Sequence, residues 1–173
     1  MMAQSAMSNT VANLNDQQYL TFLLNGEMYA FAILNVKEIL EYGKVTPIPR
    51  VPKFIQGVIN LRGEVVPVIN LAHRFQQQAS PVTKRSCIVI IEVYGEEQKQ
   101  DLGVLVDSVS EVIDIPVANI RAAPSFSCQI RTDFIRAMAE LQDNFVIILA
   151  EDKVLSVDEL AMVDQLARGI AQQ

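Results

Sequence analysis

The sequence is poor in the residue types on which most catalytic and metal sites depend. Among its 173 residues are one histidine, His73, and two cysteines, Cys87 and Cys128. The two cysteines lie far apart, so their spacing predicts neither a disulfide framework nor a zinc site. We expect both thiols to be reduced, as in cytoplasmic proteins. With a single histidine, a nucleophile–base relay would need an unusual arrangement. We therefore predict no catalytic, cofactor-binding or metal-binding residue.

Other absences exclude further classes of function. The glycines are isolated, so there is no glycine-rich phosphate loop. No apolar run approaches the ~20 residues of a membrane helix, and the first fifteen residues lack the pattern of a signal peptide. We expect a cytoplasmic protein without direct membrane insertion. The net charge is −6 and the sequence pI is about 4.8. This acidic balance argues against a nucleic-acid partner, because phosphate binding requires concentrated Lys and Arg.

Half of the residues are hydrophobic, which is enough for a core, and the segment 57–71 concentrates them in a predicted β-hairpin. Gly63 tolerates the positive φ of a tight turn, and Arg62 is the one cation at its tip. Both arms are apolar on both sides, so we expect the hairpin at the centre of a barrel or sandwich. Pro67 cannot donate a hydrogen bond, so the outgoing strand is predicted at an edge or with a bulge.

The hairpin segment has a counterpart 80 positions later in the chain. Apolar residues coincide at this constant offset in four places: Phe54-Ile55 with Phe134-Ile135, Leu61 with Leu141, Val66 with Val146, and Val68-Ile69 with Ile148-Leu149. A second correspondence, offset by 73, joins Val36–Leu40 to Val109–Ile113. A constant spacing over sixteen positions predicts a duplicated structural unit.

The duplication suggests how the chain is divided. We predict a flexible tail over 1–16 and a folded region over 17–155. Within it, a first barrel covers about 17–75 and a second covers about 84–150. A helix over 156–170, packed on one of the barrels, closes the chain.

Two helical pieces are predicted from capping patterns. Ser156 and Glu159 form a capping box at the start of the last helix, which has an apolar stripe behind it. Asn35 and Glu38 have the same spacing, which predicts a helical turn over Val36–Leu40.

Glu38 and Arg62 are the two charges within these apolar, repeated elements. Each has a simple explanation: Glu38 satisfies a helix start and Arg62 is a turn residue in water. Alternatively the two pair with each other, or each contacts a partner protein. At the offset of 80, Arg62 corresponds to Gln142. A role in folding alone would be shared by both units, so this difference favours a functional role for Arg62.

Several segments around these residues resemble the signature of the CheW family of chemotaxis coupling proteins. They are Val36-Lys-Glu-Ile, Pro52-Lys-Phe-Ile-Gln-Gly-Val-Ile-Asn-Leu-Arg-Gly63, Val66-Pro-Val-Ile-Asn-Leu71, Gly103-Val-Leu-Val-Asp-Ser-Val109 and Ile120-Arg-Ala-Ala-Pro124. The resemblance spans about 17–165. Similar blocks occur in the regulatory domain of the kinase CheA and in CheV, but this chain has no kinase or receiver domain.

The resemblance implies an all-β fold of two tandem five-stranded src-homology-3-like barrels, with short helical turns and a C-terminal α-helix. It also implies a scaffold without activity that links the cytoplasmic tip of chemoreceptors to CheA in membrane-associated arrays. The receptor contacts it implies are Ile33, Val36, Glu38, Ile39, Arg62, Val104 and Val106. For the kinase contact it suggests Ile88 and Val89. The loop 96–100 and the tail after Ile170 match no motif of the family.

Three other hypotheses remain open at the level of sequence. The chain could be a CheW-like adaptor of a chemosensory pathway other than flagellar chemotaxis. It could be a small enzyme that uses His73 or Cys87. The third, a small-barrel nucleic-acid binder, is weakened by the acidic pI.

Overall fold

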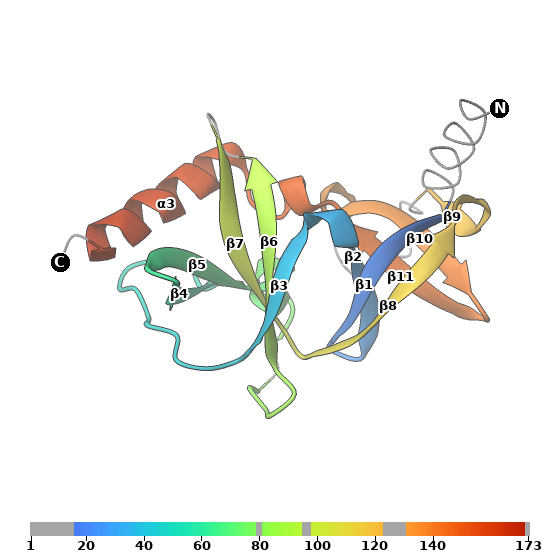
Figure 1. Ribbon diagram of the computed structural model, residues 1–173, viewed down its shortest axis with the longest axis horizontal. Helices are drawn as coiled ribbons and strands as arrows, with labels where there is room; N and C mark the ends of the chain where they lie inside the picture. The colour runs from blue at the N-terminus through green and yellow to red at the C-terminus, as the bar shows by residue number, and fades with distance from the viewer. Residues whose placement is uncertain (1–15, 79–80, 95–97, 123–130, 172–173) are drawn as a thin grey trace.

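The computed structural model describes residues 16–78, 81–94, 98–122 and 131–171, and it consists of two β-sheets side by side with one long helix (Figure 1). The strands are β1 (Asp16–Leu24), β2 (Glu27–Ala32), β3 (Val36–Glu41), β4 (Ile55–Leu61), β5 (Glu64–Asn70), β6 (Cys87–Tyr94), β7 (Lys99–Val106), β8 (Ser108–Pro116), β9 (Ile120–Arg121), β10 (Ile135–Leu141) and β11 (Asn144–Leu149). The helices are α2 (Leu71–Arg74) and α3 (Val157–Ala171), with short 3-10 turns η1 (Ile33–Asn35), η2 (Val117–Asn119), η3 (Thr132–Phe134) and η4 (Glu151–Lys153). The predicted all-β fold with two β subdomains is confirmed.

One sheet has six strands in the order β8-β1-β2-β11-β10-β9, and the other has five in the order β3-β6-β7-β5-β4. Neighbouring strands are antiparallel except for two pairs, β2 with β11 and β5 with β7. Each parallel pair joins a hairpin from one half of the chain to a hairpin from the other half.

The predicted duplication is confirmed by matching irregularities at the offset of 80. The register of β4 and β5 shifts between Ile55 and Gly57, and that of β10 and β11 shifts between Ile135 and Ala137. The amide of Asn70 donates to the carbonyl of Phe54 over 2.6 Å, and the amide of Ala150 donates to that of Phe134 over 2.9 Å. The two hairpins are therefore copies of one structural unit.

The predicted division into barrels over 17–75 and 84–150 does not match the sheets. The first hairpin of the first repeat, β1–β2, lies in the sheet of β8–β11. The first hairpin of the second repeat, β6–β7, lies in the sheet of β3–β5. The connections explain this exchange: only 33–35 separate β2 from β3, and only Asp107 separates β7 from β8. Such short links lead the chain onward into the neighbouring sheet and not back across its own hairpin. The segments 17–75 and 84–150 are repeats, but neither forms a sheet alone.

Three apolar clusters hold this arrangement together. One lies within the six-stranded sheet and includes Tyr19 and Ile148, and another lies within the five-stranded sheet and includes Val68 and Ile90. The largest joins the two sheets, with Phe22 on one side. We call it the inter-sheet core. Side chains alternate along a strand, so the hairpins β1–β2 and β6–β7 each place some side chains in the cluster of their own sheet and others in this shared core.

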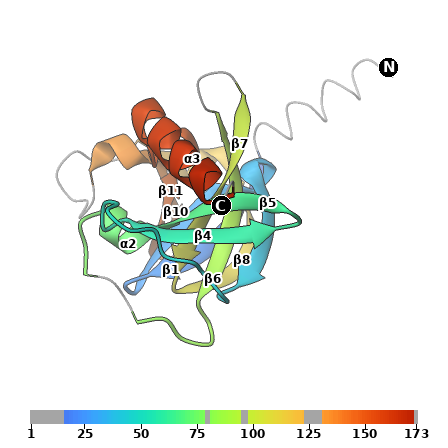
Figure 2. The same cartoon turned by 90° about the vertical axis from the view of Figure 1, so that its left-hand side faces the viewer.

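The closing helix α3 lies against β5 (Figure 2). Its Leu160 and Val163 are almost fully buried in the inter-sheet core. The predicted capping box is confirmed: the Ser156 amide donates to Glu159 over 2.8 Å, and the Glu159 amide donates to the Ser156 hydroxyl over 3.1 Å. The predicted packing of this helix on a sheet is also observed.

Two local predictions were wrong. Residues Val36–Leu40 form part of strand β3 and no helical turn, because β-branched side chains favour a strand and β6 offers a partner for the backbone. The 3-10 turn lies just before, at Ile33–Asn35. Strand β5, which contains Pro67, lies between β4 and β7 and is not an edge strand, and the register shift of this hairpin lies in β4, between Ile55 and Gly57, and not at Pro67. Its parallel ladder with β7 begins only at Val68, so that ladder does not require an N–H from the proline.

Candidate functional site

The Arg62 side chain pairs with Glu38, as the sequence suggested as one alternative. Nη1 of Arg62 lies 2.6 Å from Oε2 of Glu38. The arginine side chain is 74% exposed and that of Glu38 is 25% exposed, so the pair lies at the surface. It joins the turn between β4 and β5 to strand β3.

The turn holds Arg62 in a fixed direction. Arg62 has φ 53° and Gly63 has φ 87°, two positive values in succession, as in the two-residue turns that suit the twist of a hairpin. The Gly63 amide also donates to Oδ1 of Asn60 over 2.9 Å. The hydrogen bond to Glu38 and the charge of that carboxylate raise the pKa of the Arg62 guanidinium. The guanidinium therefore remains charged at physiological pH.

Glu38 lies in a partly apolar surface that we call the η1–β3 strip. It consists of Ile33, Leu34, Val36, Glu38, Ile39 and Arg62. Leu34 is 90% exposed and Ile39 is 43% exposed. Ile33 and Val36 are half-buried against the inter-sheet core. Strand β3 is also an edge of its sheet. The strip thus has exposed apolar side chains along an edge strand. Ile39 and Glu38 point to opposite faces of β3: Ile39 pairs with Val89 of the inter-sheet core, and Glu38 pairs with Ile90 of the other cluster.

Lys37 lies at the register shift between Val36 and Glu38 and has partners on β6 and β7. Its Nζ lies 2.9 Å from Oδ1 of Asp101 on β7 and 4.0 Å from Oε2 of Glu92 on β6. The hydrogen bond with Asp101 raises the pKa of Lys37. This lysine ties β3 to its sheet and is already neutralised there.

Four of the sequence-predicted contact residues are buried in this structure. Val104 and Val106 on β7, and Val89 on β6, are almost fully buried in the inter-sheet core. Ile88 is buried within the five-stranded sheet. A side chain that the core covers cannot contact a partner, so their role is to hold β6 and β7 in place.

Arg74 has a structural role that the sequence analysis did not identify. Its Nε donates to the carbonyl of Val154 over 2.6 Å, and its Nη2 lies 2.8 Å from Oε1 of Glu159 on α3. The guanidinium also stacks over Phe54 at 4.9 Å and over Phe134 at 5.2 Å from the ring centroids. These two phenylalanines are equivalent in the two repeats. Their equivalence was the feature of the sequence that could have pointed to a shared contact here. The side chain is only 17% exposed.

The two residues considered for catalysis, His73 and Cys87, lie in the short helix α2 and at the start of strand β6. His73 lies in α2, where its backbone amide donates to Oδ1 of Asn70. The Cys87 thiol is free, and its Sγ contacts the carbonyl of Arg85. Cys128 lies outside the described residues. Within the described part of the chain, no group of three or more His, Cys, Asp or Glu side chains could hold a metal ion.

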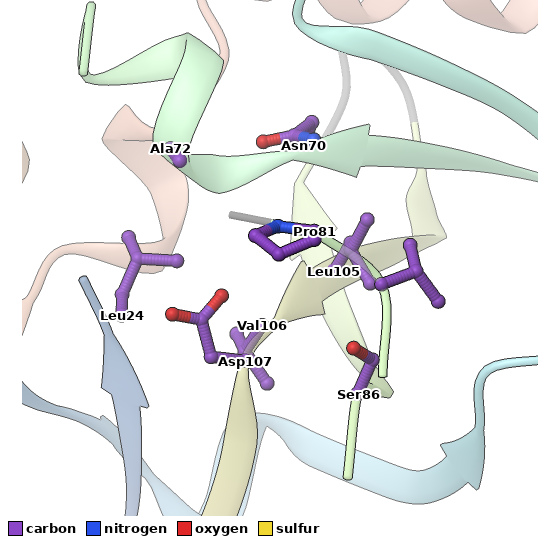
Figure 3. A pocket seen from close by; sticks show the side chains of 9 residues that line it. Leu24, Asn70, Ala72, Pro81, Ser86, Leu105, Val106 and Asp107 are labelled. Atoms are coloured by element: carbon purple, nitrogen blue, oxygen red, sulfur yellow. The ribbon is translucent and has the colours of Figure 1, made fainter. Parts of the chain in front are cut away.

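A small cavity lies at the junction of the two sheets (Figure 3). Its lining comes from β1, β5, α2, β7 and the segment before β6, and consists of Leu24, Asn70, Ala72, Pro81, Val82, Ser86, Leu105, Val106 and Asp107. Its volume is about 10 Å³, which is room for roughly one water molecule. The cavity is therefore too small for an organic substrate. Among the described residues, none of the helices is both long and apolar enough to cross a membrane.

Comparisons with known proteins agree with this architecture. The family model for the CheW-like domain matches residues 18–159, which is most of the described chain. The chain belongs to the CheW family.

Two curated relatives match 88% of the chain, and a third matches a shorter part of it. A chemotaxis protein CheW of Klebsiella aerogenes is 35% identical over 153 residues, which is 88% of this chain and 90% of the relative. That of Treponema pallidum is 31% identical over 88% of this chain and 91% of the relative. Protein FrzA of Myxococcus xanthus is 32% identical over 63% of this chain and 66% of the relative. Among solved structures, the scaffolding protein TtCheW of Thermoanaerobacter tengcongensis has a TM-score of 0.75 at 35% identity, covering 83% of this chain and 90% of that one.

Proposed function

We propose that this CheW-family chain is a non-catalytic scaffold that couples chemoreceptors to the histidine kinase CheA in chemotaxis signalling. As a scaffold it acts in the cytoplasm and is recruited to receptor arrays through its protein partners. The observation that carries the proposal is the η1–β3 strip in a chain of this family. There Glu38, paired with Arg62, and exposed Ile39 are neighbours along edge strand β3, and exposed Leu34 lies in the 3-10 turn before it.

The strip suits the helical tip of a receptor. A helix that docks on a protein surface buries an apolar stripe and gains most of its energy from a few anchors. Ile39 and Leu34 supply exposed apolar anchors, and half-buried Val36 continues the apolar surface. Glu38 and Arg62 add a charge pattern that a helix of complementary charge recognises, which favours one orientation over others.

The kinase contact is proposed on a surface separate from the strip. Ile88 and Val89, which the resemblance suggested for this contact, are buried. If they affect kinase binding, they do so by holding β6 and the exposed residues around it. A scaffold with two separate surfaces can bind receptor and kinase at the same time, which coupling requires.

A second candidate function keeps the scaffold role and changes the pathway. In that case the chain performs the same scaffolding in a chemosensory pathway other than flagellar chemotaxis. Identification of the receptor and kinase that co-purify with the chain distinguishes the two pathways.

The proposal is tested by measuring two binding isotherms for each variant, one with a soluble receptor-tip fragment and one with the CheA regulatory domain. We expect Ile39→Ser and Glu38→Lys each to weaken receptor binding by about tenfold or more, the usual effect of losing an interface anchor. Kinase binding should stay within about twofold of wild type, since the kinase uses another surface.

The matched control is Lys37→Ala, the neighbour in β3 that pairs within its own sheet. Its effect on receptor binding should be smaller than that of Ile39→Ser. Equal losses toward both partners would show that the substitutions disturb the fold and that the strip is not a dedicated receptor surface. Turnover of a substrate that disappears on His73→Ala or Cys87→Ala would instead support an enzyme.

A further inference from the structure

The buried carboxylate of Glu151 lies beside Ala32, the residue after which the chain leaves the six-stranded sheet for the five-stranded one. Its Oε1 accepts a hydrogen bond from the backbone amide of Ala32 over 2.9 Å, and its Oε2 lies 3.2 Å from Nη2 of Arg136. The Glu151 side chain is 3% exposed, whereas that of Arg136 is 49% exposed. Ala32 is the last residue of β2, and η1 begins directly after it.

The carboxylate binds the Ala32 amide just beyond the end of the β2–β11 ladder, while the β1–β2 ladder still reaches Ala32. The ladder that joins β2 to β11 pairs Ala30 with Ile148 and does not reach Ala32. In the other sheet, the equivalent of Ala32 at the offset of 73 is Leu105, and there the ladder continues to this position, pairing Leu105 with Asn70. The equivalent of Glu151 at the offset of 80 is Leu71, an apolar residue. A carboxylate thus occurs only in the copy whose ladder ends early.

We propose that Glu151, supported by Arg136, is a positioning residue that fixes η1 and thereby orients the η1–β3 strip. Satisfying the Ala32 amide inside the protein removes the freedom of the chain at the point from which η1 departs. Ile33 and Leu34 are the next two residues, and β3 begins at Val36, directly after the three residues of η1. The orientation of these side chains toward a partner depends on the direction set at Ala32. The receptor-binding part of this inference rests on the function proposed above.

The experiment compares three variants of the full chain. Glu151→Leu introduces the residue found in the other repeat and removes the acceptor. Glu151→Gln keeps an oxygen that can accept from the Ala32 amide. Asp152→Asn alters the exposed second partner of Arg136, at 3.6 Å, and leaves the Ala32 hydrogen bond untouched. Each variant is examined by amide hydrogen exchange and by binding to the receptor-tip fragment and to the CheA regulatory domain.

For Glu151→Leu we expect exchange at Ala32 and through η1 to accelerate by about tenfold or more, since local opening controls exchange. Receptor binding should weaken by about tenfold, while kinase binding stays unchanged. Glu151→Gln should restore most of the protection and affinity, and Asp152→Asn should behave as wild type. Should the leucine variant fail to fold, Arg136→Met carries the same test, because it removes the cation that holds the carboxylate.

The outcomes separate this inference from the proposed function. Unchanged exchange at Ala32 in Glu151→Leu overturns the positioning role. The role is also overturned if Glu151→Leu exchanges faster but keeps full receptor affinity, while Ile39→Ser binds the receptor more weakly. Equal loss of both partners also overturns it, since it indicates a general structural role. If exchange accelerates but neither Glu151→Leu nor Ile39→Ser changes receptor affinity, the strip is not the receptor surface. The proposed function of the strip then fails, and the carboxylate only orders η1.

Discussion

At the scale of single residues, the Arg62–Glu38 pair carries an asymmetry between otherwise similar units. The two partners are 24 positions apart in the chain, and the pair joins one outermost strand of the five-stranded sheet, β3, to the turn that follows the other, β4. The turn that presents Arg62 recurs in the second unit, where Gln142 and Asp143 also have positive φ. The turn geometry therefore does not require an arginine. The sequence alone indicated this difference, because the comparison needs only the constant offset of 80.

We expect Arg62→Ala to leave the unfolding temperature essentially unchanged and to impair receptor-dependent stimulation of the kinase. The guanidinium is 74% exposed, and exposed ion pairs contribute little to stability. Alanine has the same Cβ as arginine, so the positive φ is no more strained. Gln142→Ala in the equivalent turn is the control and should preserve both properties. A large fall in the unfolding temperature for Arg62→Ala would assign the pair a structural role instead.

At the scale of secondary-structure elements, the sequence predicted the hairpins and the last helix more successfully than the short pieces. The β4–β5 and β10–β11 hairpins and α3 have long apolar patterns with turn or capping residues at their ends. By contrast, Val36–Leu40 has the spacing of a capping box, yet it forms strand β3 because it pairs with β6. That partner strand lies far away in the sequence, with Ile39 opposite Val89. Local patterns cannot reveal such a partner.

The attachment of α3 gives a test at this scale. We expect Arg74→Ala to lower the free energy of unfolding by about 2 kcal/mol, because it removes a half-buried side chain with two charge-assisted hydrogen bonds. Amides of α3 should exchange faster, since the Val154 carbonyl loses its bond to Arg74 and Glu159 keeps only the Ser156 amide. Chemical denaturation measures the first effect and hydrogen exchange the second.

Arg168→Ala is the matched control for Arg74, since its ion pair with Asp164 lies on the exposed side of the same helix. It should have a much smaller effect on unfolding, as expected for an exposed pair within one helix. Equal effects of the two substitutions would mean that Arg74 contributes no more than a surface charge.

At the scale of the whole molecule, the chain crosses between the sheets twice, at 33–35 and at Asp107. The duplication was visible in the sequence, but the exchange of the two first hairpins was not. Either hairpin has the apolar pattern to complete either sheet, so periodicity does not choose between the pairings. The choice follows from the short connections and from the inter-sheet core, which both hairpins share.

This exchange predicts how the protein responds to being cut between its repeats. Residues 16–78 and 81–171, produced separately, should each fail to fold, because each lacks strands that complete both of its sheets. Mixed together, they should reassemble into a 1:1 complex that is less stable than the intact chain and whose stability rises with concentration. The intact chain should unfold in a single transition with equal calorimetric and van't Hoff enthalpies, since the inter-sheet core belongs to both sheets. Circular dichroism and calorimetry of each fragment, of the mixture and of the intact chain measure these outcomes. A cooperative transition in one isolated fragment would mean that a repeat can form a barrel of its own, and that the exchanged pairing is not needed for folding.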